Sequence, residues 1–245
     1  METSRAHSSN DKLIVALDLS DRVSALEMAK RLQSICRWVK VGLELYLAAG
    51  QGVVEELRAM GFFVFLDLKL HDIPNTVAGA VSSVASSGAS LLTLHATGGP
   101  AMLEAAVAAA ARTADGPRLL AVTVLTSMDA AQLAATGITT PVQERVLQLG
   151  AMAMRSGVAG LVCSPLEIQS LRTSLTQEEP LLVVPGIRSA SDAMGDQSRT
   201  ASAGDAIRSG ASMLVVGRPI TTAADPARAA VRILNEIAAA ENSLG

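Results

Sequence analysis

The sequence predicts an α/β protein built as a single-domain (β/α)8 TIM barrel. Short apolar segments alternate with helical patterns from one end of the chain to the other. The apolar segments are hydrophobic at both alternating positions, which is typical of parallel strands that are buried on both faces. Eight strand–helix units follow one another over residues 11–245 without a linker-like stretch, and barrels of this size are commonly one domain.

The strands and helices follow one another at regular intervals. The strands are expected at LIVALD (13–18), WVKVGL (38–43), FFVFLDLK (62–69), SLLTLH (90–95), LLAVTVLT (119–126), GLVCS (160–164), LLVVPG (181–186) and SMLVVG (212–217). Helical patterns lie at 21–34, 51–60, 75–87, 100–113, 141–156, 165–175, 199–209 and 225–241. Proline, which the first turn of a helix tolerates, begins five of them: Pro74, Pro100, Pro141, Pro165 and Pro226. Glycine, which readily adopts a left-handed cap conformation, follows four of them: Gly61, Gly88, Gly157 and Gly210.

An open, doubly wound sheet is the alternative arrangement for the same alternation. That fold carries a glycine-rich loop after its first strand, whereas Asp18-Leu19-Ser20-Asp21 follows the first strand here. A closed catalytic barrel is therefore expected over residues 11–245. Residues 1–10 are polar and lack the apolar segment of a signal peptide, so we expect a flexible N-terminal tail.

Composition and charge exclude several classes of protein. A net charge of −3 and a pI near 5.6 argue against binding to nucleic acid or to anionic membranes, because both need a basic surface. Apolar runs such as 119–125 are far shorter than the ~20 residues that span a bilayer. Cys36 and Cys163 lack a metal-ligand or redox spacing, which favours two buried apolar residues over a redox pair. A cytoplasmic protein is expected.

Polar side chains stand at the C-terminal ends of the predicted strands, where barrels of this kind place their reactive residues. They are Asp18, Lys40, Asp67, Lys69, His95, Thr126, Ser164, Arg188 and Arg218. In the third strand, alternation puts Asp67 and Lys69 on one face and Leu68 on the other. An isolated pair of this kind can be a structural ion pair. Lys40 on the adjoining strand and Asp72 shortly after Lys69 favour a functional array, since buried charges are costly unless they are paired.

The charges of this array indicate the chemistry that it supports. An ammonium group beside carboxylates stays charged, so it is a poor Schiff-base nucleophile and a good acid for negative charge that develops on carbon. The sequence contains no clustered metal ligands, and no metal or other cofactor is expected. His95 is either a ligand contact or a structural histidine.

A separate anion site is expected after the seventh and eighth strands. Pro185-Gly186-Ile187-Arg188 and Gly217-Arg218-Pro219-Ile220-Thr221 combine glycine amides with arginines in the usual phosphate position of these barrels. The long polar segment 189–200 between them is a candidate lid.

The segment DLKLHDIPNTV (67–77) resembles the signature of orotidine 5′-monophosphate decarboxylases, in particular the compact bacterial type. The resemblance extends over nearly the whole chain, through VALD (15–18), KVGLELY (40–46), LHATGG (94–99), VLTSM (124–128), PGIR (185–188) and VVGRPIT (215–221). It implies decarboxylation of orotidine 5′-monophosphate to uridine 5′-monophosphate, the last step of de novo UMP synthesis, by a lyase that needs no cofactor.

The resemblance also implies a role for each matched residue. The charged tetrad comprises Lys40, Asp67, Lys69 and Asp72, with Lys69 as the proton donor and Asp67 near the departing carboxylate. Asp72 and Thr76 would reach into the active site of a neighbouring subunit, so a homodimer is expected. The substrate would be held at the ribose by Asp18 and Lys40, at the pyrimidine edge by Thr126 with Ser127, and at the phosphate by Arg188, Gln197, Gly217 and Arg218.

Two alternatives to this activity remain at the level of the sequence. A related barrel family of magnesium-dependent sugar-phosphate decarboxylases and aldolases also carries DxKxxD, but it places a glutamate where this chain has Lys40. The other alternative is a phosphate-binding barrel that has lost its activity, and the intact tetrad argues against it.

Overall fold

Parallel strands that are apolar on both faces need cover on both sides, and a closed barrel also removes the sheet edges. The computed structural model describes residues 9–188 and 200–244. Its parallel strands follow chain order: β1 (Leu13–Ala16), β2 (Trp38–Gly42), β3 (Phe63–Leu70), β4 (Leu91–His95), β5 (Arg118–Val122), β6 (Gly160–Val162), β7 (Leu181–Val184) and β8 (Met213–Val216). Because β1 pairs with both β2 and β8, the barrel is closed. The predicted (β/α)8 TIM barrel is confirmed, and an open doubly wound sheet is excluded.

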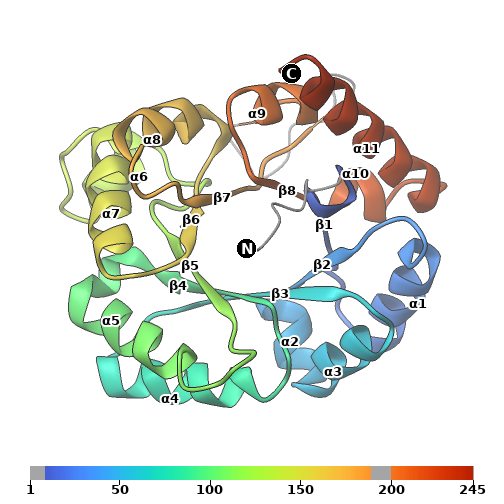
Figure 1. Cartoon of the computed structure of the whole chain (residues 1–245), viewed down its shortest axis with the longest axis horizontal. Coiled ribbons are helices and arrows are strands. Elements are labelled where there is room, and N and C mark those ends of the chain that lie inside the picture. Colours follow the sequence, from blue (N-terminus) through green and yellow to red (C-terminus); the bar gives the residue numbers. More distant parts are fainter. Residues whose placement is uncertain (1–8, 189–199, 245) are drawn as a thin grey trace, which may run out of the picture.

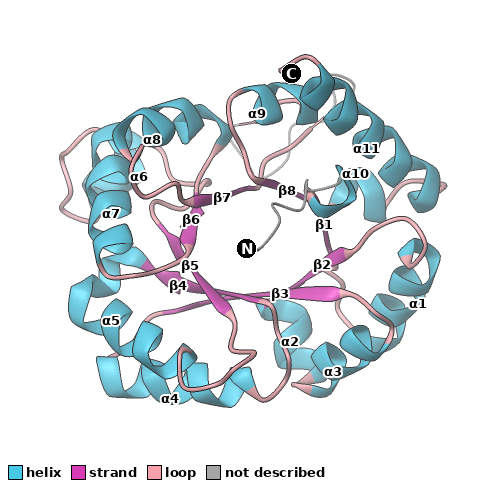
Figure 2. Cartoon of the chain, viewed as in Figure 1, coloured by secondary structure: helices cyan, strands magenta, loops and turns pink. Residues whose placement is uncertain are grey.

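The helices form a ring outside the strands, as Figures 1 and 2 show. Those that match the predicted helices are α1 (Arg22–Leu32), α3 (Gly52–Ala59), α4 (Pro74–Ala85), α5 (Gly99–Ala110), α7 (Val142–Arg155), α8 (Ile168–Ser174), α9 (Ala203–Arg208) and α11 (Pro226–Asn242). Five short helices were not predicted, because they are too short to show a helical period: η1 (Ser9–Asp11), α2 (Leu43–Ala49), η2 (Ala96–Gly98), α6 (Ala130–Ala135) and α10 (Arg218–Thr221). The helix predicted at 165–175 begins with a 3-10 turn, η3 (Pro165–Glu167), which α8 continues.

The predicted helix boundaries hold with small corrections. All four glycines expected as caps have a positive φ: Gly61 (92°), Gly88 (74°), Gly157 (86°) and Gly210 (103°). Pro141 precedes α7 as its N-cap instead of lying in the first turn. β1 ends at Ala16 rather than at residue 18, and β5 ends at Val122 rather than at residue 126, because the paired register stops there. The polar residues predicted at these two strand ends therefore lie on loops.

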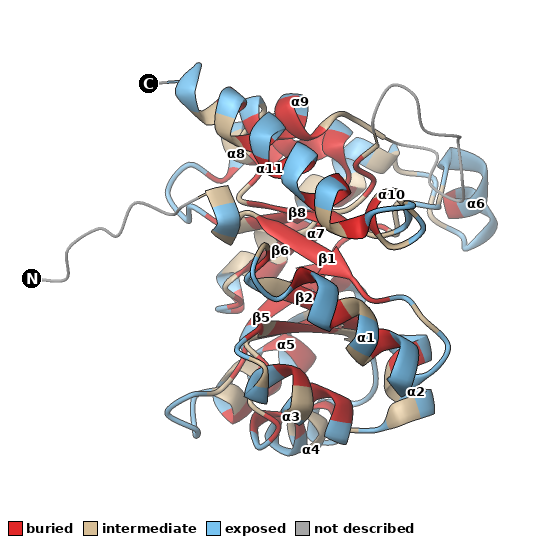
Figure 3. Ribbon diagram, turned by 90° about the vertical axis from the view of Figure 1, so that its right-hand side faces the viewer, coloured by how far each residue is buried: buried red, intermediate tan, exposed pale blue. Residues whose placement is uncertain are grey.

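Side chains on the two faces of the strands form two separate apolar layers. Inside the barrel, alternate strand residues make a small cluster: Ile14, Ala16, Phe65, Leu91, Leu120, Val183, Met213 and Val215. The remaining strand residues pack against the helices in a larger cluster, which Leu68 joins as predicted. Figure 3 shows the buried strands between helices whose outer faces are exposed. The inward alternation continues from Phe65 to Asp67, and on β4 it reaches Thr93, so both residues face the barrel axis.

Three further sequence predictions concern the tail, the cysteines and the membrane. Of the expected tail, residues 9 and 10 belong to η1, where the Ser9 hydroxyl donates to Glu241 of α11 (2.5 Å), and residues 1–8 lie outside the described residues. Both cysteines are buried and free, and burial raises the pKa of Cys36 to about 12, which fits apolar packing. Within the described ranges, no helix has the length and apolar character required to cross a bilayer.

Candidate active site

A cavity of about 440 Å³ opens at the C-terminal ends of the strands. Inward-facing side chains give it an apolar floor: Ala16, Phe65, Val122, Val162 and Val215. The polar residues that line it are Asp18, Lys40, Asp67, Lys69, Thr126, Arg188, Gly217, Arg218 and Thr221. The structure thus brings eight of the predicted site residues together, and Thr221 joins them. This composition suits a ligand with an apolar part and several polar groups.

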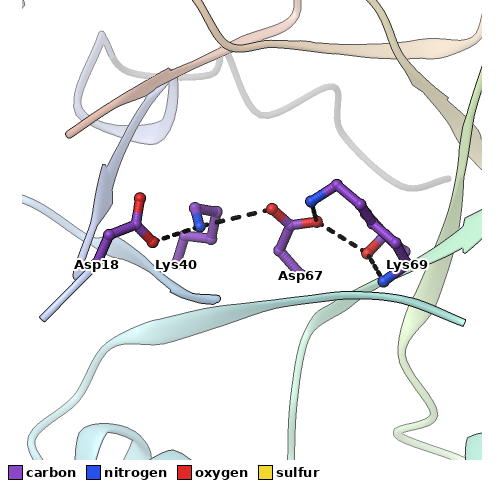
Figure 4. Close-up of polar contacts among 5 residues, drawn as sticks. Asp18, Lys40, Asp67 and Lys69 are labelled. Atoms are coloured by element: carbon purple, nitrogen blue, oxygen red, sulfur yellow. Dashed lines mark hydrogen bonds and ion pairs between the residues drawn. The ribbon is translucent and has the colours of Figure 1, made fainter. Parts of the chain in front are cut away.

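Four charged side chains form an alternating row along the wall of this cavity (Figure 4). Lys40 lies on β2, and Asp67 and Lys69 lie on β3, whereas Asp18 lies on the loop after β1. These residues come together because β1 pairs with β2 and β2 pairs with β3. Lys40 Nζ lies 2.7 Å from Asp18 Oδ1 and 3.5 Å from Asp67 Oδ2. Lys69 Nζ lies 2.8 Å from Asp67 Oδ1. Asp67 therefore holds one ammonium group with each of its carboxylate oxygens.

The two middle residues of the row, Lys40 and Asp67, keep their charges although little of either side chain is exposed. Burial disfavours the charged form of Lys40, but the carboxylates of Asp67 and Asp18 outweigh this effect and raise the pKa of Lys40. Burial likewise disfavours ionised Asp67, yet the charges of Lys40 and Lys69 and hydrogen bonds from Lys69 and Thr93 hold its pKa below the usual value. The Lys69 side chain is 37% exposed against 10% for Lys40, so its ammonium group is the more accessible of the two.

The backbone of β3 is irregular where it carries this row. Between Leu66 and Leu70, β3 advances four residues while β4 advances two, so three residues of β3 lie opposite Thr93 alone. A bulge of this kind re-aims the side chains that it contains. Lys69 lies in it with a φ of 52°, a left-handed conformation that is unfavourable for a residue with a Cβ. The amide of Lys69 donates to Thr93 Oγ1 (2.9 Å), and this hydroxyl donates to Asp67 Oδ1 (3.0 Å).

Loops after β7 and β8 complete the polar lining. Gly186 has a φ of 83°, which favours glycine, and its carbonyl accepts a hydrogen bond from the Ala201 amide (3.2 Å). The Arg188 amide donates to the Ala201 carbonyl (3.0 Å), so these two bonds join the chain on either side of segment 189–199. Gly217 is the N-cap of α10, and Arg218 begins that helix beside the cavity. The lid predicted at 189–200, with Gln197, falls outside the described residues except for its last residue.

Comparison with known proteins identifies the family. Residues 11–233 match the model of the "Orotidine 5'-phosphate decarboxylase / HUMPS family". The chain belongs to this family. A relative named orotidine 5′-phosphate decarboxylase from Anaeromyxobacter sp. (strain K) is 48% identical, and the match covers 90% of this chain and 96% of the relative. A relative of the same name from Halorhodospira halophila is 49% identical, and the match covers 94% of this chain and 97% of the relative. The crystal structure of orotidine 5′-phosphate decarboxylase from Lactobacillus acidophilus has a TM-score of 0.82 and 39% identity, and the match covers 92% of this chain and 98% of that chain.

Two residues predicted for the decarboxylase site lie away from the cavity of their own chain. Asp72 and Thr76 are exposed, and neither is among the described residues that line the cavity. Asp72 Oδ1 accepts a hydrogen bond from the Ile73 amide (2.6 Å). Asp18, and not Asp72, is the fourth charge in the row of this orotidine 5′-phosphate decarboxylase family member. Alternation along β3 does not predict this, because Asp18 follows β1.

His95 lies beside the decarboxylase cavity without lining it. It lines a smaller cavity of about 280 Å³ behind Val124 and Leu125, which border both spaces. Burial, with the nearby charges of His71 and Lys69, lowers the pKa of His95, and the two histidine rings are 5.5 Å apart. Among the residues that the structure describes, no three His, Cys, Asp or Glu side chains are grouped as metal ligands.

Sequence reasoning missed two residues that shape the charged row. A Cβ at Gly42 would lie 2.8 Å from both Asp18 Oδ1 and Lys40 Nζ, so any side chain there would displace this ion pair. Thr93 is completely buried and hydrogen-bonds to both Asp67 and the Lys69 backbone. A signal for Thr93 does exist in the sequence, because a polar residue at an inward position of an apolar strand needs a hydrogen-bond partner.

Proposed function

We propose that this chain decarboxylates orotidine 5′-monophosphate to uridine 5′-monophosphate, the last step of de novo UMP synthesis. The observation that carries the proposal is the alternating row of Asp18, Lys40, Asp67 and Lys69 beside a 440 Å³ cavity, in a chain of the decarboxylase family. Loss of CO₂ leaves negative charge on a ring carbon that delocalises it poorly. An ammonium group that is already in place stabilises such charge without reorganisation at the moment of reaction.

Lys69 acts as the proton donor in this proposal. As the bond between the ring carbon and the carboxyl group breaks, the electron pair stays on the ring carbon and the carboxyl group leaves as CO₂. Lys69 Nζ then transfers its proton to that carbon, which forms the C–H bond of the product, and regains a proton from water. Asp67, 2.8 Å from Lys69 Nζ and 3.5 Å from Lys40 Nζ, orients both ammonium groups beside the departing carboxylate.

Further residues bind the substrate away from the reacting carbon. The proposed contacts are Asp18 and Lys40 to the ribose, Thr126 to the pyrimidine edge, and Arg188, Gln197, Gly217 and Arg218 to the phosphate. Arginine and glycine amides suit a phosphate because they supply charged donors and allow close approach. Binding energy from this remote group then supports the chemical step.

The proposed enzyme is a homodimer in which Asp72 and Thr76 complete the partner's active site. Both residues are exposed, and neither is among the described residues that line the cavity of their own chain. In that cavity the fourth charge of the row is Asp18. Three apolar side chains are also exposed. Ile73 follows Asp72 directly in the chain, and Leu43 and Leu47 lie in α2, which follows β2, the neighbour of β3. Such surface is typical of protein–protein contacts.

The decisive experiment is an absorbance assay of orotidine 5′-monophosphate turnover by the purified chain, before and after exhaustive chelation. Decarboxylation at an unchanged rate after chelation is expected. A rate lost on chelation and restored by magnesium favours the metal-dependent sugar-phosphate chemistry. Binding of uridine 5′-monophosphate without turnover favours the inactive phosphate-binding barrel and contradicts the proposal.

A further inference from the structure

We infer that Thr93 is a positioning residue for the proton donor: its buried hydroxyl holds the β3 bulge in the conformation that directs Lys69 and Asp67 into the cavity. The inference rests on the proposed function and adds a residue to it. Thr93 lies on β4, is 0% exposed, and is not among the described residues that line the cavity. It therefore acts through Asp67 and Lys69 and does not touch the substrate.

The first step concerns the backbone of the bulge. Three residues of β3 lie opposite Thr93 alone, so the regular ladder cannot supply every amide between Leu66 and Leu70 with a carbonyl of β4. The Lys69 amide donates instead to Thr93 Oγ1 (2.9 Å). An amide without a partner in this place is unfavourable. The hydroxyl thus takes the place of a ladder carbonyl and supports the left-handed φ of 52° at Lys69.

The second step concerns the direction in which Lys69 points. In the observed bulge, the Lys69 side chain returns to the inward face and its Nζ reaches Asp67 Oδ1 at 2.8 Å. Relaxation of Lys69 to an ordinary negative φ would turn the peptide and move Nζ away from that oxygen. Placement errors of about 1 Å are enough to lower a chemical rate about 100-fold. The position of Lys69 Nζ therefore depends on the backbone conformation of Lys69 that Thr93 supports.

The third step concerns Asp67. A hydroxyl has one donor and two acceptor sites, so Thr93 Oγ1 can accept from the Lys69 amide and still donate to Asp67 Oδ1 (3.0 Å). The charged and titratable groups that act on Asp67 are Lys40 on β2, Lys69 on β3 and His95 on β4. The hydrogen bond from Thr93 adds to the effect of the two lysines and helps to hold the pKa of Asp67 low. Loss of the hydroxyl should raise that pKa.

The test compares Thr93→Val, which keeps the shape and removes the hydroxyl, with Thr93→Ser, which keeps the hydroxyl. Thr123→Val is the matched control, because Thr123 is also buried in the adjacent β5 region but donates to the Val162 carbonyl (3.4 Å) away from the row. For Thr93→Val we expect kcat to fall about 10- to 100-fold while the Kd for uridine 5′-monophosphate changes less than about twofold. Thr93→Ser and Thr123→Val should stay within about threefold of wild type in kcat.

The pH profile separates positioning from a loss of packing. In Thr93→Val the acidic limb of kcat should move to higher pH, because Asp67 has lost a donor, whereas Thr123→Val should leave that limb in place. Equal losses of kcat in Thr93→Ser and Thr93→Val, or an unshifted acidic limb in Thr93→Val, would overturn the inference. If Thr93→Val does not fold, Thr93→Ala, which removes the same hydroxyl with a smaller side chain, carries the same comparison.

A structural measurement keeps this inference separate from the proposed function. Crystal structures of Thr93→Val and Thr93→Ser should show Lys69 leaving its positive φ in the valine variant and keeping it in the serine variant. An unchanged Lys69 in Thr93→Val overturns the positioning role even if the wild-type chain is a fully active decarboxylase. Failure of the wild-type chain to decarboxylate orotidine 5′-monophosphate would contradict the proposed function while this conformational comparison still stands.

Discussion

At the scale of single residues, the site depends on one carboxylate that holds two ammonium groups. Asp67 accepts from Lys69 through Oδ1 and lies 3.5 Å from Lys40 through Oδ2. A buried carboxylate between two lysines remains ionised, and it orients both ammonium groups. Lys69 is then available as an acid at the cavity, whereas Lys40 is held by a second carboxylate, Asp18, at 2.7 Å.

Replacement of Lys69 by methionine tests its role as the donor. Lys69→Met keeps most of the side-chain volume but removes both the charge and the proton, so kcat should fall about 1,000-fold or more. Binding of uridine 5′-monophosphate, measured by calorimetry, should remain within about tenfold, because the phosphate contacts are intact. A kcat within tenfold of wild type would rule out Lys69 as the proton donor.

The low pKa of Asp67 predicts a pH-dependent contribution to stability. The folded-state pKa lies below the usual 3.8, so ionised Asp67 stabilises the fold above the unfolded pKa, and this contribution is lost as the pH falls through the folded value. Asp67→Asn should therefore be destabilised by about 3 kcal/mol near pH 7, and the difference from wild type should shrink below about pH 4. Urea unfolding at several pH values measures this difference. A gap of equal size at pH 3 and pH 7 would contradict the assigned pKa direction.

At the scale of elements, strand ends and the turns that follow them place the functional groups. The inward alternation of β2 and β3 ends in Lys40 and Asp67 at the cavity, and the loops after β7 and β8 supply the proposed phosphate end. Short helices follow two of these strand ends: α2 begins directly after β2, and α10 begins after Gly217 and places Arg218 and Thr221 in the lining of the cavity. Small residues at these turns leave room for the charged groups.

The contribution of Arg218 to phosphate binding should be separable from its effect on the chemical step. Arg218→Ala should lower kcat/KM for the nucleotide about 10- to 100-fold, as expected for the loss of a charged hydrogen bond. The same variant should hardly change turnover of the nucleoside orotidine, which carries no phosphate. Equal proportional losses with the two substrates would show that Arg218 does not contact the phosphate.

The turn from β2 to α2 provides a second prediction at this scale. Gly42→Ala would place a Cβ 2.8 Å from both Asp18 Oδ1 and Lys40 Nζ, and these flexible ends must then separate. Because the φ of Gly42 is −87°, alanine fits the backbone and the fold should persist. We expect a rise in KM of about 5- to 100-fold from the lost ion pair and ribose contacts, with a melting temperature close to that of wild type. Wild-type kinetics in Gly42→Ala would show that the Asp18–Lys40 contact is dispensable.

At the scale of the whole molecule, one closed barrel converts residues far apart in the chain into one site. The cavity is lined from Ala16 to Thr221, and closure between β1 and β8 is what brings these ends together. The molecule nevertheless leaves Asp72 on its surface, beside exposed Ile73. In a two-fold symmetric dimer, each subunit would lend the same loop to its partner.

Mixed dimers test this shared site. Lys69→Ala and Asp72→Asn homodimers should each be nearly inactive, since one loses the acid and the other a charge of the site. After subunit exchange, a mixed dimer carries both lesions in one site and none in the other, so it should recover about half of the wild-type activity. Native mass spectrometry confirms the exchange. If mixed dimers form and no activity returns, Asp72 serves its own subunit.

Several features of this protein follow from the sequence by itself. The eight apolar segments are hydrophobic at both alternating positions, so the strands must be buried on both faces, and this determines a parallel barrel. Glycine after a helix determines the cap, since a positive φ is a local property. The positions of Lys40, Asp67 and Lys69 at strand ends are also local, and the packing of Leu68 against the helices agrees with the predicted alternation.

Other features were decided by the tertiary structure. The bulge of β3 depends on its pairing with β4. Its two hydrogen bonds join Thr93 to Lys69 and to Asp67, which are 24 and 26 positions away in the chain, so periodicity along one strand cannot reveal it. The inclusion of Asp18 in the charged row and the need for glycine at position 42 likewise arise where three strand ends converge. Alternation reports the face to which a side chain points, whereas the distance between two side chains on different strands depends on the register in which those strands pair.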